Sequence, residues 1–294
     1  MWLGKKRGYL QDWITQVWVK LTGRRIDPAS HQWLLGPVGN TDKISDTFIP
    51  SLCEKEQLVE KRNGKDFGLM HSVTEWNLAD QELGRLNKNV ADFYERTVNY
   101  DFEVWSSWSG VFLPFGKLLN LIFSRRLQQL NLPLKPLDSA KGIQSNIIKL
   151  FPSGSEVPKW TIWYRILKSK NDVIYSGVYS TAFLDKLSSQ CLKVVFPLPN
   201  GNATVVMKIS VMEDGALFLE SKGRKFGYPG FYFTLTNHKG KFWARYVRSM
   251  HETIRVFEDD EGVLRADHFL KFWGMYFLKL HYKMTKKPVT SSIL

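Results

Sequence analysis

Residues 194–220 read VVFPLPNGNATVVMKISVMEDGALFLE, a stretch with two turn signals between strand-like runs. The dipeptides Asn200-Gly201 and Asp214-Gly215 supply the positive φ angles that tight hairpins need. Between them, one set of alternate positions is apolar throughout: Ala203, Val205, Met207, Ile209 and Val211. Period-two alternation bounded by such turns predicts antiparallel β-strands.

The same pattern continues on both sides of this stretch, over residues 160–284. Further turn signals occur at Ser169–Asp172, Lys239–Gly240 and Asp259–Gly262. The segment His268–Tyr282 fits both the strand and the helix period, and we interpret it as a strand. The pattern predicts an antiparallel meander of about eight or nine strands. Such a meander closes into a barrel or forms a strongly curved sheet, and either encloses apolar space.

The N-terminal half has helical rather than strand periodicity. Residues 2–21 are predicted to form an amphipathic helix, which either docks its apolar stripe onto the domain or lies in a membrane interface. Residues 78–100 show a second helical pattern. Residues 105–132 are strongly apolar and are interpreted as a core helix, with a membrane-interface element as the alternative. The predicted fold class is therefore α+β. It has a mainly helical region 1–150 followed by an antiparallel β-barrel-like region 151–294.

The charge of the chain favours anionic partners. The net charge is +13, from 41 basic and 28 acidic residues, and the β-rich half is the more basic. Lipid, nucleic acid and phosphorylated ligands all suit such a surface. Cys53 and Cys191 give no disulfide framework. No apolar run reaches the length of a membrane span, and we find no signal peptide, so the expected location is the cytoplasm, possibly at the inner face of the membrane.

Residues 222–248 combine cations with aromatic side chains and contain no acidic residue. The cations are Lys222, Arg224, Lys225, Lys239, Lys241, Arg245 and Arg248. Simple strand alternation, with aromatic residues facing inward and cations facing outward, explains this composition. An anionic membrane surface or single-stranded nucleic acid would also be suited to it. We predict contact with a membrane or another anion at Trp13 and Trp18 of the N-terminal helix, and at Lys222, Arg224, Lys225, Arg245 and Arg248.

A histidine pair is the second candidate feature. If a four-residue loop at Asp259–Gly262 places Glu258 opposite Val263, then His251 and His268 become diagonal neighbours on one face. Arg255 shares that face, whereas Glu252 and Asp267 point to the other. With Phe231 and Phe233, these residues form the predicted ligand-binding set: His251, His268, Arg255, Phe231 and Phe233. No Asp, Glu or Cys on this face completes a metal site.

Established enzyme and cofactor motifs are absent from the sequence. We find no nucleophile elbow, no zinc-protease helix and no dinucleotide fingerprint, so no catalytic residue, metal or cofactor is assigned. The leading hypothesis is a binding protein for an apolar or amphipathic ligand, peripherally associated with an anionic membrane surface. One alternative is an enzyme that uses the histidine pair on a small apolar substrate. The other is nucleic-acid binding through residues 222–248.

Overall fold

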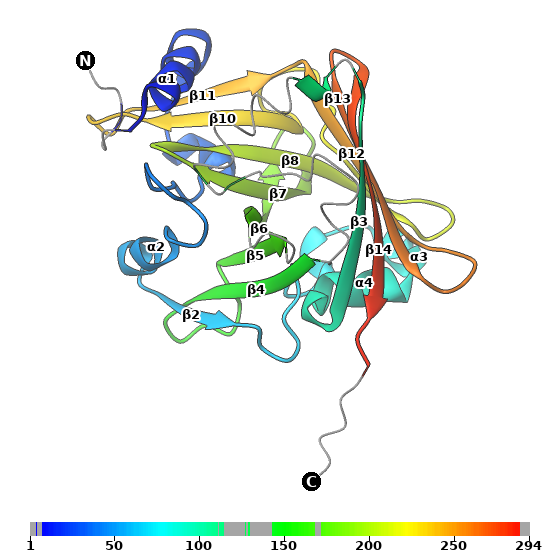
Figure 1. The fold of residues 1–294 in the computed structure, drawn as a ribbon. Helices are drawn as coiled ribbons and strands as arrows, with labels where there is room; N and C mark the ends of the chain where they lie inside the picture. Colours follow the sequence, from blue (N-terminus) through cyan, green and yellow to red (C-terminus); the bar gives the residue numbers. More distant parts are fainter. Residues whose placement is uncertain are drawn as a thin grey trace.

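The strands predicted from the alternating pattern form one antiparallel sheet (Figure 1). The computed structural model describes residue 4 and residues 8–110, 112–114, 127, 129, 143–167 and 172–288. Neighbouring strands in the chain are mostly neighbours in the sheet, as short turns require.

Ten strands of the described part close into a ring, because β9 pairs with both β12 and β8. A closed ring surrounds an interior, and in this ring β3 and β4 are joined by a single described residue pair, Phe102 and Ile143. In sheet order, the strands are β8 (Gly201–Val211), β7 (Ser189–Leu198), β6 (Asp172–Leu184), β5 (Trp160–Leu167), β4 (Ile143–Pro152), β3 (Tyr100–Trp108), β14 (Met275–Lys286), β13 (Leu264–Phe272), β12 (Met250–Glu258) and β9 (Leu217–Glu220).

Four further described strands extend the sheet beyond the ring. The first half of β8 pairs with β10 (Gly230–Thr236), whereas its second half pairs with β9. Next to β10 lie β11 (Phe242–Val247) and then β1 (Arg24–Ile26), while β2 (Leu58–Arg62) pairs with β4. The predicted barrel is confirmed, with more strands than the eight or nine expected.

Four of the additional described strands, β1 to β4, lie before Trp160, where the meander was expected to begin, and one more results from a turn that was not predicted. Asn200, Gly215, Gly240 and Gly262 all have positive φ, as their turn signals predict. The sequence reading missed a two-residue turn at Trp273-Gly274, where both φ values are positive. This turn divides the segment that was interpreted as a single strand into β13 and β14. The predicted turn at Ser169–Asp172 lies almost entirely outside the described residues.

The helices are short (Figure 1), and some of them cover the ends of the barrel, whereas Ile49 and Leu52 of α2 (Ile49–Glu56) pack against the outer face of the sheet. The predicted N-terminal helix is present as α1, from Leu10 to Thr22, and the start of the predicted range, at Trp2 and Leu3, lies outside the described residues. The second helical pattern divides into two helices, because Asn87 caps a new helix with its side chain. The remaining helices are α2 (Ile49–Glu56), α3 (Asp80–Arg85), α4 (Lys88–Glu95) and the 3₁₀ turns η1 (Ala29–Leu34), η2 (Val73–Trp76) and η3 (Thr97–Asn99).

The sheet extends across the predicted boundary at residue 150. Strands β3 and β4 both begin before it and take part in the ring. Trp105, which begins the apolar stretch interpreted as a helix, lies within β3 instead. Most of the rest of that stretch lies outside the described residues. Buried and exposed positions alternate along β3, and this period of two explains why Tyr100–Trp108 forms a strand and not a helix.

Helices close the two ends of the barrel, and β8 runs between those ends. Gln16 of α1 donates to the carbonyl of Pro199, just before β8 begins, at 3.3 Å. At the other end of the strand, the backbone N–H of Val211 donates to Glu82 of α3 at 2.9 Å. Phe93 of α4 packs into the same core cluster as the inward side chains of β8. The barrel interior is therefore bounded by strands around its side and by helices at its ends.

Candidate ligand-binding site

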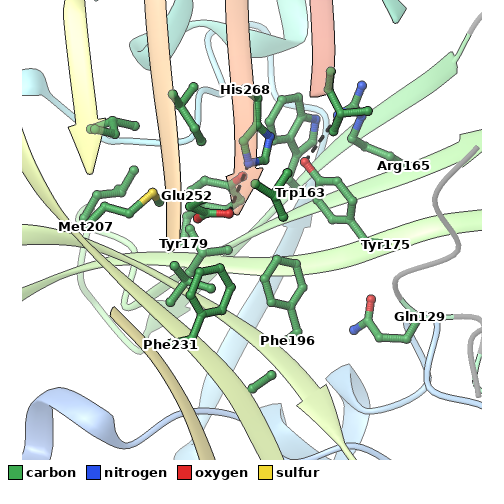
Figure 2. Close-up of a pocket in the computed structure, with 18 of the residues that line it drawn as sticks. Gln129, Trp163, Arg165, Tyr175, Tyr179, Phe196, Met207, Phe231, Glu252 and His268 are labelled. Carbon is green, nitrogen blue, oxygen red and sulfur yellow. Dashed lines mark hydrogen bonds and ion pairs between the residues drawn. The ribbon is translucent and has the colours of Figure 1, made fainter. Parts of the chain in front are cut away.

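The barrel encloses a cavity of about 480 Å³ (Figure 2). An eight-stranded barrel is just wide enough to be filled by side chains or to hold one small ligand, and the interior widens with strand number. A ten-stranded ring therefore has room to spare. The lining is mainly apolar and aromatic, and includes Leu69, Phe93, Phe102, Trp163, Val194, Phe196, Val205, Met207, Phe231 and Phe233.

Polar groups are few and are spread around this lining. Tryptophans aside, the described polar and charged side chains are Asp12, Thr15, Gln16, Gln129, Arg165, Tyr175, Tyr179, Thr234, Glu252, His268 and Tyr282, together with Tyr94. Figure 2 shows His268 and Glu252 together on one side of the cavity, and Arg165 beside Tyr175 on another. An apolar cavity with a small number of placed polar groups is the usual form of a small-molecule site.

His268 lies in the cavity, as predicted, but its partner is not His251. In β12, the cavity side carries Glu252, and Glu252 Oε2 lies 3.1 Å from His268 Nε2. His251 faces Lys271 on the outer side of the barrel. The predicted pairing of His251 with His268 on one face is therefore wrong. The polar pair in the interior is a histidine and a carboxylate.

Arg255 is also on the outer side and not in the cavity lining. It pairs with Asp267 across the strands and forms an ion pair with Asp214. Its guanidinium lies 4.1 Å from the centre of the Phe257 ring. The prediction that Arg255 shares the face of His268 is wrong, since the two residues belong to opposite faces of the hairpin.

Both wrong predictions have one cause, which is the length of the β12–β13 loop. Glu258 pairs with Leu264, not with Val263, so the loop is one residue longer than expected. The carboxylate of Asp259 accepts from the backbone N–H of Val263 at 2.8 Å, and Gly262 has a φ of 73°. A turn followed by a residue in the left-handed region is a common hairpin bulge. A one-residue slip moves every side chain to the other face of the sheet.

The two phenylalanines of the predicted site do line the cavity. Phe231 and Phe233 lie on β10 opposite Val205 and Ala203 of β8, which also face the interior. Phe233 additionally makes an edge contact with Trp18 of α1, with ring centres 5.6 Å apart. Their role in ligand binding remains a prediction.

Arg165 was not predicted from the sequence, although it is a deeply buried cation of the cavity lining. It is 2 % exposed and lies in the middle of β5, pointing to the interior. Four aromatic rings surround the guanidinium, with centres 4.7–5.4 Å from Cζ: Phe102, Trp163, Tyr175 and Tyr282. The alternation of β5 gave a possible signal, because Arg165 lies between Tyr164 and Ile166 in a strand without other charge.

Two tyrosines near Arg165, Tyr179 and Tyr282, are neutral at physiological pH. Burial raises the pKa of Tyr282 to about 12, against the lowering effect of the neighbouring arginine. Burial also raises the pKa of Tyr179 well above its ordinary value. Neutral hydroxyls both donate and accept hydrogen bonds, so this side of the cavity can hold a polar ligand group.

Helix α1 covers one end of the cavity with its polar side. Asp12, Gln16 and Val19 are its buried residues, and all three line the cavity. Three of its large apolar residues face outward: Leu10 is 69 %, Ile14 56 % and Leu21 77 % exposed. This is the reverse of a helix docked through its apolar stripe, which the composition alone also allowed.

The predicted anion-contact residues lie in different settings. Trp18 is partly exposed on α1, and Trp13 is half-buried. Lys222, Arg224, Lys225 and Arg248 are exposed. Arg245 is half-buried and donates to the Thr22 carbonyl at 2.6 Å, so it caps the end of α1. Their contact with a membrane or another anion remains a prediction.

No group of three or more potential metal ligands comes together in the described part of the chain. Among the described helices, none has both the length and the apolar character needed to cross a bilayer.

The fold and cavity together define a closed antiparallel β-barrel protein with an internal, mainly apolar site. No family model matches the chain, and no solved structure matches it significantly. The chain is similar to the "Uncharacterized membrane protein YndJ" of Bacillus subtilis (strain 168), with 25 % identity over 250 residues. The match covers 83 % of this chain but 41 % of that protein, so the chain spans less than half the length of its relative.

Proposed function

We propose that the chain binds an apolar or amphipathic ligand in the barrel cavity while α1 contacts an anionic membrane surface. The observation that carries this proposal is the cavity itself. Its volume of about 480 Å³ falls within the range of roughly 300–1,000 Å³ that small-molecule sites occupy. Its lining offers aromatic and aliphatic surface almost everywhere, which favours a ligand with a large apolar part.

The exposed side of α1 supports the membrane part of the proposal. Leu10, Ile14 and Leu21 form a stripe at helical spacing that faces away from the barrel. Lys20, Arg24 and Arg25 are exposed beside it. Apolar side chains flanked by cations are typical of helices that lie in the interface of an anionic bilayer. The relative from Bacillus subtilis carries the description of a membrane protein, which is consistent with this location.

Native mass spectrometry of the chain purified from its producing cells tests the ligand part. We expect a co-purified apolar compound. We expect Ala266→Phe, which fills space on the cavity side of β13, to lower its occupancy about tenfold. Thr285→Phe, at an exposed position of β14, is the matched control and should leave it unchanged. A chain that carries no compound and also fails to bind an apolar dye would contradict the proposal.

Acid–base catalysis is a second candidate, favoured by the Glu252–His268 contact. A carboxylate that holds an imidazole in one orientation is a recurring arrangement for general acid–base chemistry. The same experiment separates the two candidates. If the recovered compound is changed in mass by the wild type and not by His268→Gln, while both still bind it, then the chain is an enzyme.

A further inference from the structure

Arg165 is a buried cation that forms no ion pair with any described carboxylate. Its side chain is 2 % exposed and lies in the cavity lining. No ion pair joins it to a carboxylate anywhere in the described part of the chain. Guanidinium groups keep their proton in proteins, so the charge persists in the cavity. Isolated buried charges are costly, and a site that retains one usually has a counterion to offer it.

The hydrogen-bonding groups of Arg165 are only partly used. Nη1 donates to the Tyr175 hydroxyl at a long 3.4 Å, and the Tyr282 hydroxyl also interacts with the guanidinium. Nε and Nη2 are buried and have no acceptor among the described residues. Figure 2 shows Arg165 and Tyr175 side by side at the cavity wall. The rings around Arg165 offset part of its charge through cation–π contacts, but they leave these N–H donors without conventional acceptors.

The other lining residues indicate which kind of ligand group would accept hydrogen bonds from Arg165. Arg165 is the only lysine or arginine among the described lining residues, so the site offers one permanent positive charge. Of the two acidic side chains, Glu252 contacts His268, and Asp12 accepts from the backbone N–H of Tyr9 at 3.1 Å. One guanidinium matches one carboxylate in both charge and planar shape. A doubly charged phosphate would leave one negative charge unbalanced in an apolar cavity.

We propose that Arg165 binds the carboxylate of a long-chain carboxylic acid whose apolar chain occupies the rest of the cavity. The tyrosine hydroxyls beside Arg165 complete the polar end of the site, and the aromatic and aliphatic lining surrounds the chain. This inference rests on the proposed ligand-binding function and adds the ligand class and the anchoring residue. The anchor differs from His251 and Arg255, which the register places outside the cavity.

Calorimetric titration of the delipidated full chain at pH 8 tests the proposal. The probes are dodecanoate, dodecanol and dodecyl phosphate, which share one apolar chain and differ in the headgroup. We expect wild type to bind dodecanoate about tenfold or more tightly than dodecanol, as a charge-assisted pair in a dry site requires. Arg165→Met should lower the affinity for dodecanoate about tenfold and leave that for dodecanol unchanged, which also shows that the variant is folded.

Matched variants assign the effect to Arg165. Arg165→Lys keeps the charge without the planar fork, so part of the preference for dodecanoate should return. Arg62→Met removes an exposed guanidinium on β2, outside the cavity, and should preserve the full preference. Loss of the preference in Arg62→Met would overturn the assignment to Arg165.

The outcomes separate this inference from the function on which it rests. If wild type binds neither dodecanoate nor dodecanol, the cavity proposal fails and the inference falls with it. If wild type binds both equally, the cavity proposal stands and the role of Arg165 is overturned. Tenfold tighter binding of dodecyl phosphate than of dodecanoate would overturn the choice of a carboxylate. The comparison in wild type decides these cases even if a variant at Arg165 does not fold.

Discussion

At the residue scale, Lys193 is a second buried cation, and it lies outside the cavity. It is 4 % exposed, and its Nζ donates to the Leu35 carbonyl at 3.1 Å. Its ammonium group also lies 5.2 Å from the centre of the Trp160 ring. Burial lowers the pKa of Lys193 to about 8, because the charged form loses its hydration.

The lowered pKa of Lys193 makes the unfolding free energy depend on pH, and the sign of this dependence follows from the direction of the shift. Between pH 8 and the ordinary value of 10.5, the unfolded chain holds the proton of Lys193 more strongly than the folded chain. The unfolding free energy therefore rises with pH over this window, and the destabilising effect is full below it. We expect Lys193→Met to raise the unfolding free energy at pH 7 by about 1–3 kcal/mol, net of the lost hydrogen bond. This gain should shrink as the pH approaches 10.5.

Urea unfolding at pH 7 and pH 10 checks this prediction. Lys208→Met, at an exposed position of the adjacent strand β8, is the control and should change stability by less than about 0.5 kcal/mol at both pH values. A variant of Lys193 that is destabilised equally at both pH values would show that its hydrogen bond matters more than its burial.

Residue identity alone did not reveal the interior polar groups. His268 was selected because the expected hairpin register placed it beside His251, and the same register assigned Glu252 to the opposite face. Arg165 was not among the predicted site residues, because a single arginine in a strand is ordinarily a solvated cation. Only the positions of Phe102 and Tyr282 around it, from strands far away in the sequence, show that it is enclosed.

At the element scale, turn chemistry sets the strand boundaries. The turn between β13 and β14 needs positive φ at Trp273 and Gly274, with values of 47° and 80°. We expect Gly274→Ala to destabilise the chain by about 1 kcal/mol, because a Cβ is strained in this conformation. Gly84 lies in helix α3, where an added Cβ would have no neighbouring atom within 4 Å. There, Gly84→Ala should stabilise by about 0.5–1 kcal/mol.

Thermal or urea unfolding of the two variants provides the measurement. Their opposite signs are the decisive feature, since both changes add the same methyl group. A shift in the same direction for both variants would mean that neither backbone conformation governs the result.

Strands with a long, strict alternation of apolar residues were predictable. A loop whose exact length decides the register of its strands was not. Strands β8 and β10 appear where the alternating pattern places them. The β12–β13 loop was located correctly, but its length was short by one residue, and this error reversed the relation between the faces of the two strands. Helix α1 was predicted from its stripe, but the stripe gave no indication of which side faces the barrel.

At the scale of the whole molecule, α1 joins the cavity to the exposed apolar stripe. Its buried side lines the cavity and its other side carries Leu10, Ile14 and Leu21. We expect the triple change of these residues to Ser to lower binding to phosphatidylglycerol-containing vesicles at least tenfold. Each large apolar side chain contributes on the order of 1 kcal/mol when it is even partly buried in the bilayer.

Co-sedimentation with vesicles measures this effect. The control changes three apolar residues of similar exposure elsewhere on the molecule: Val59, Val157 and Phe183 to Ser. It should bind vesicles as wild type does. Added salt should weaken binding of wild type as well, because Lys20, Arg24 and Arg25 act through screened charge. Equal binding by both triple variants would exclude α1 as the membrane contact.

The sequence by itself determined an antiparallel meander that forms a barrel or a strongly curved sheet. It also determined the principal turns, the N-terminal helix and the position of Phe231 and Phe233 on one face of a strand. These features depend on local backbone preference and on period-two alternation, both of which act over a few residues. Only the tertiary structure decided that His268 meets Glu252, that Arg165 is enclosed in the cavity and that α1 exposes its apolar side. Each of these depends on how the strands close into a ring, which brings together residues far apart in the chain, such as Arg165 and Tyr282.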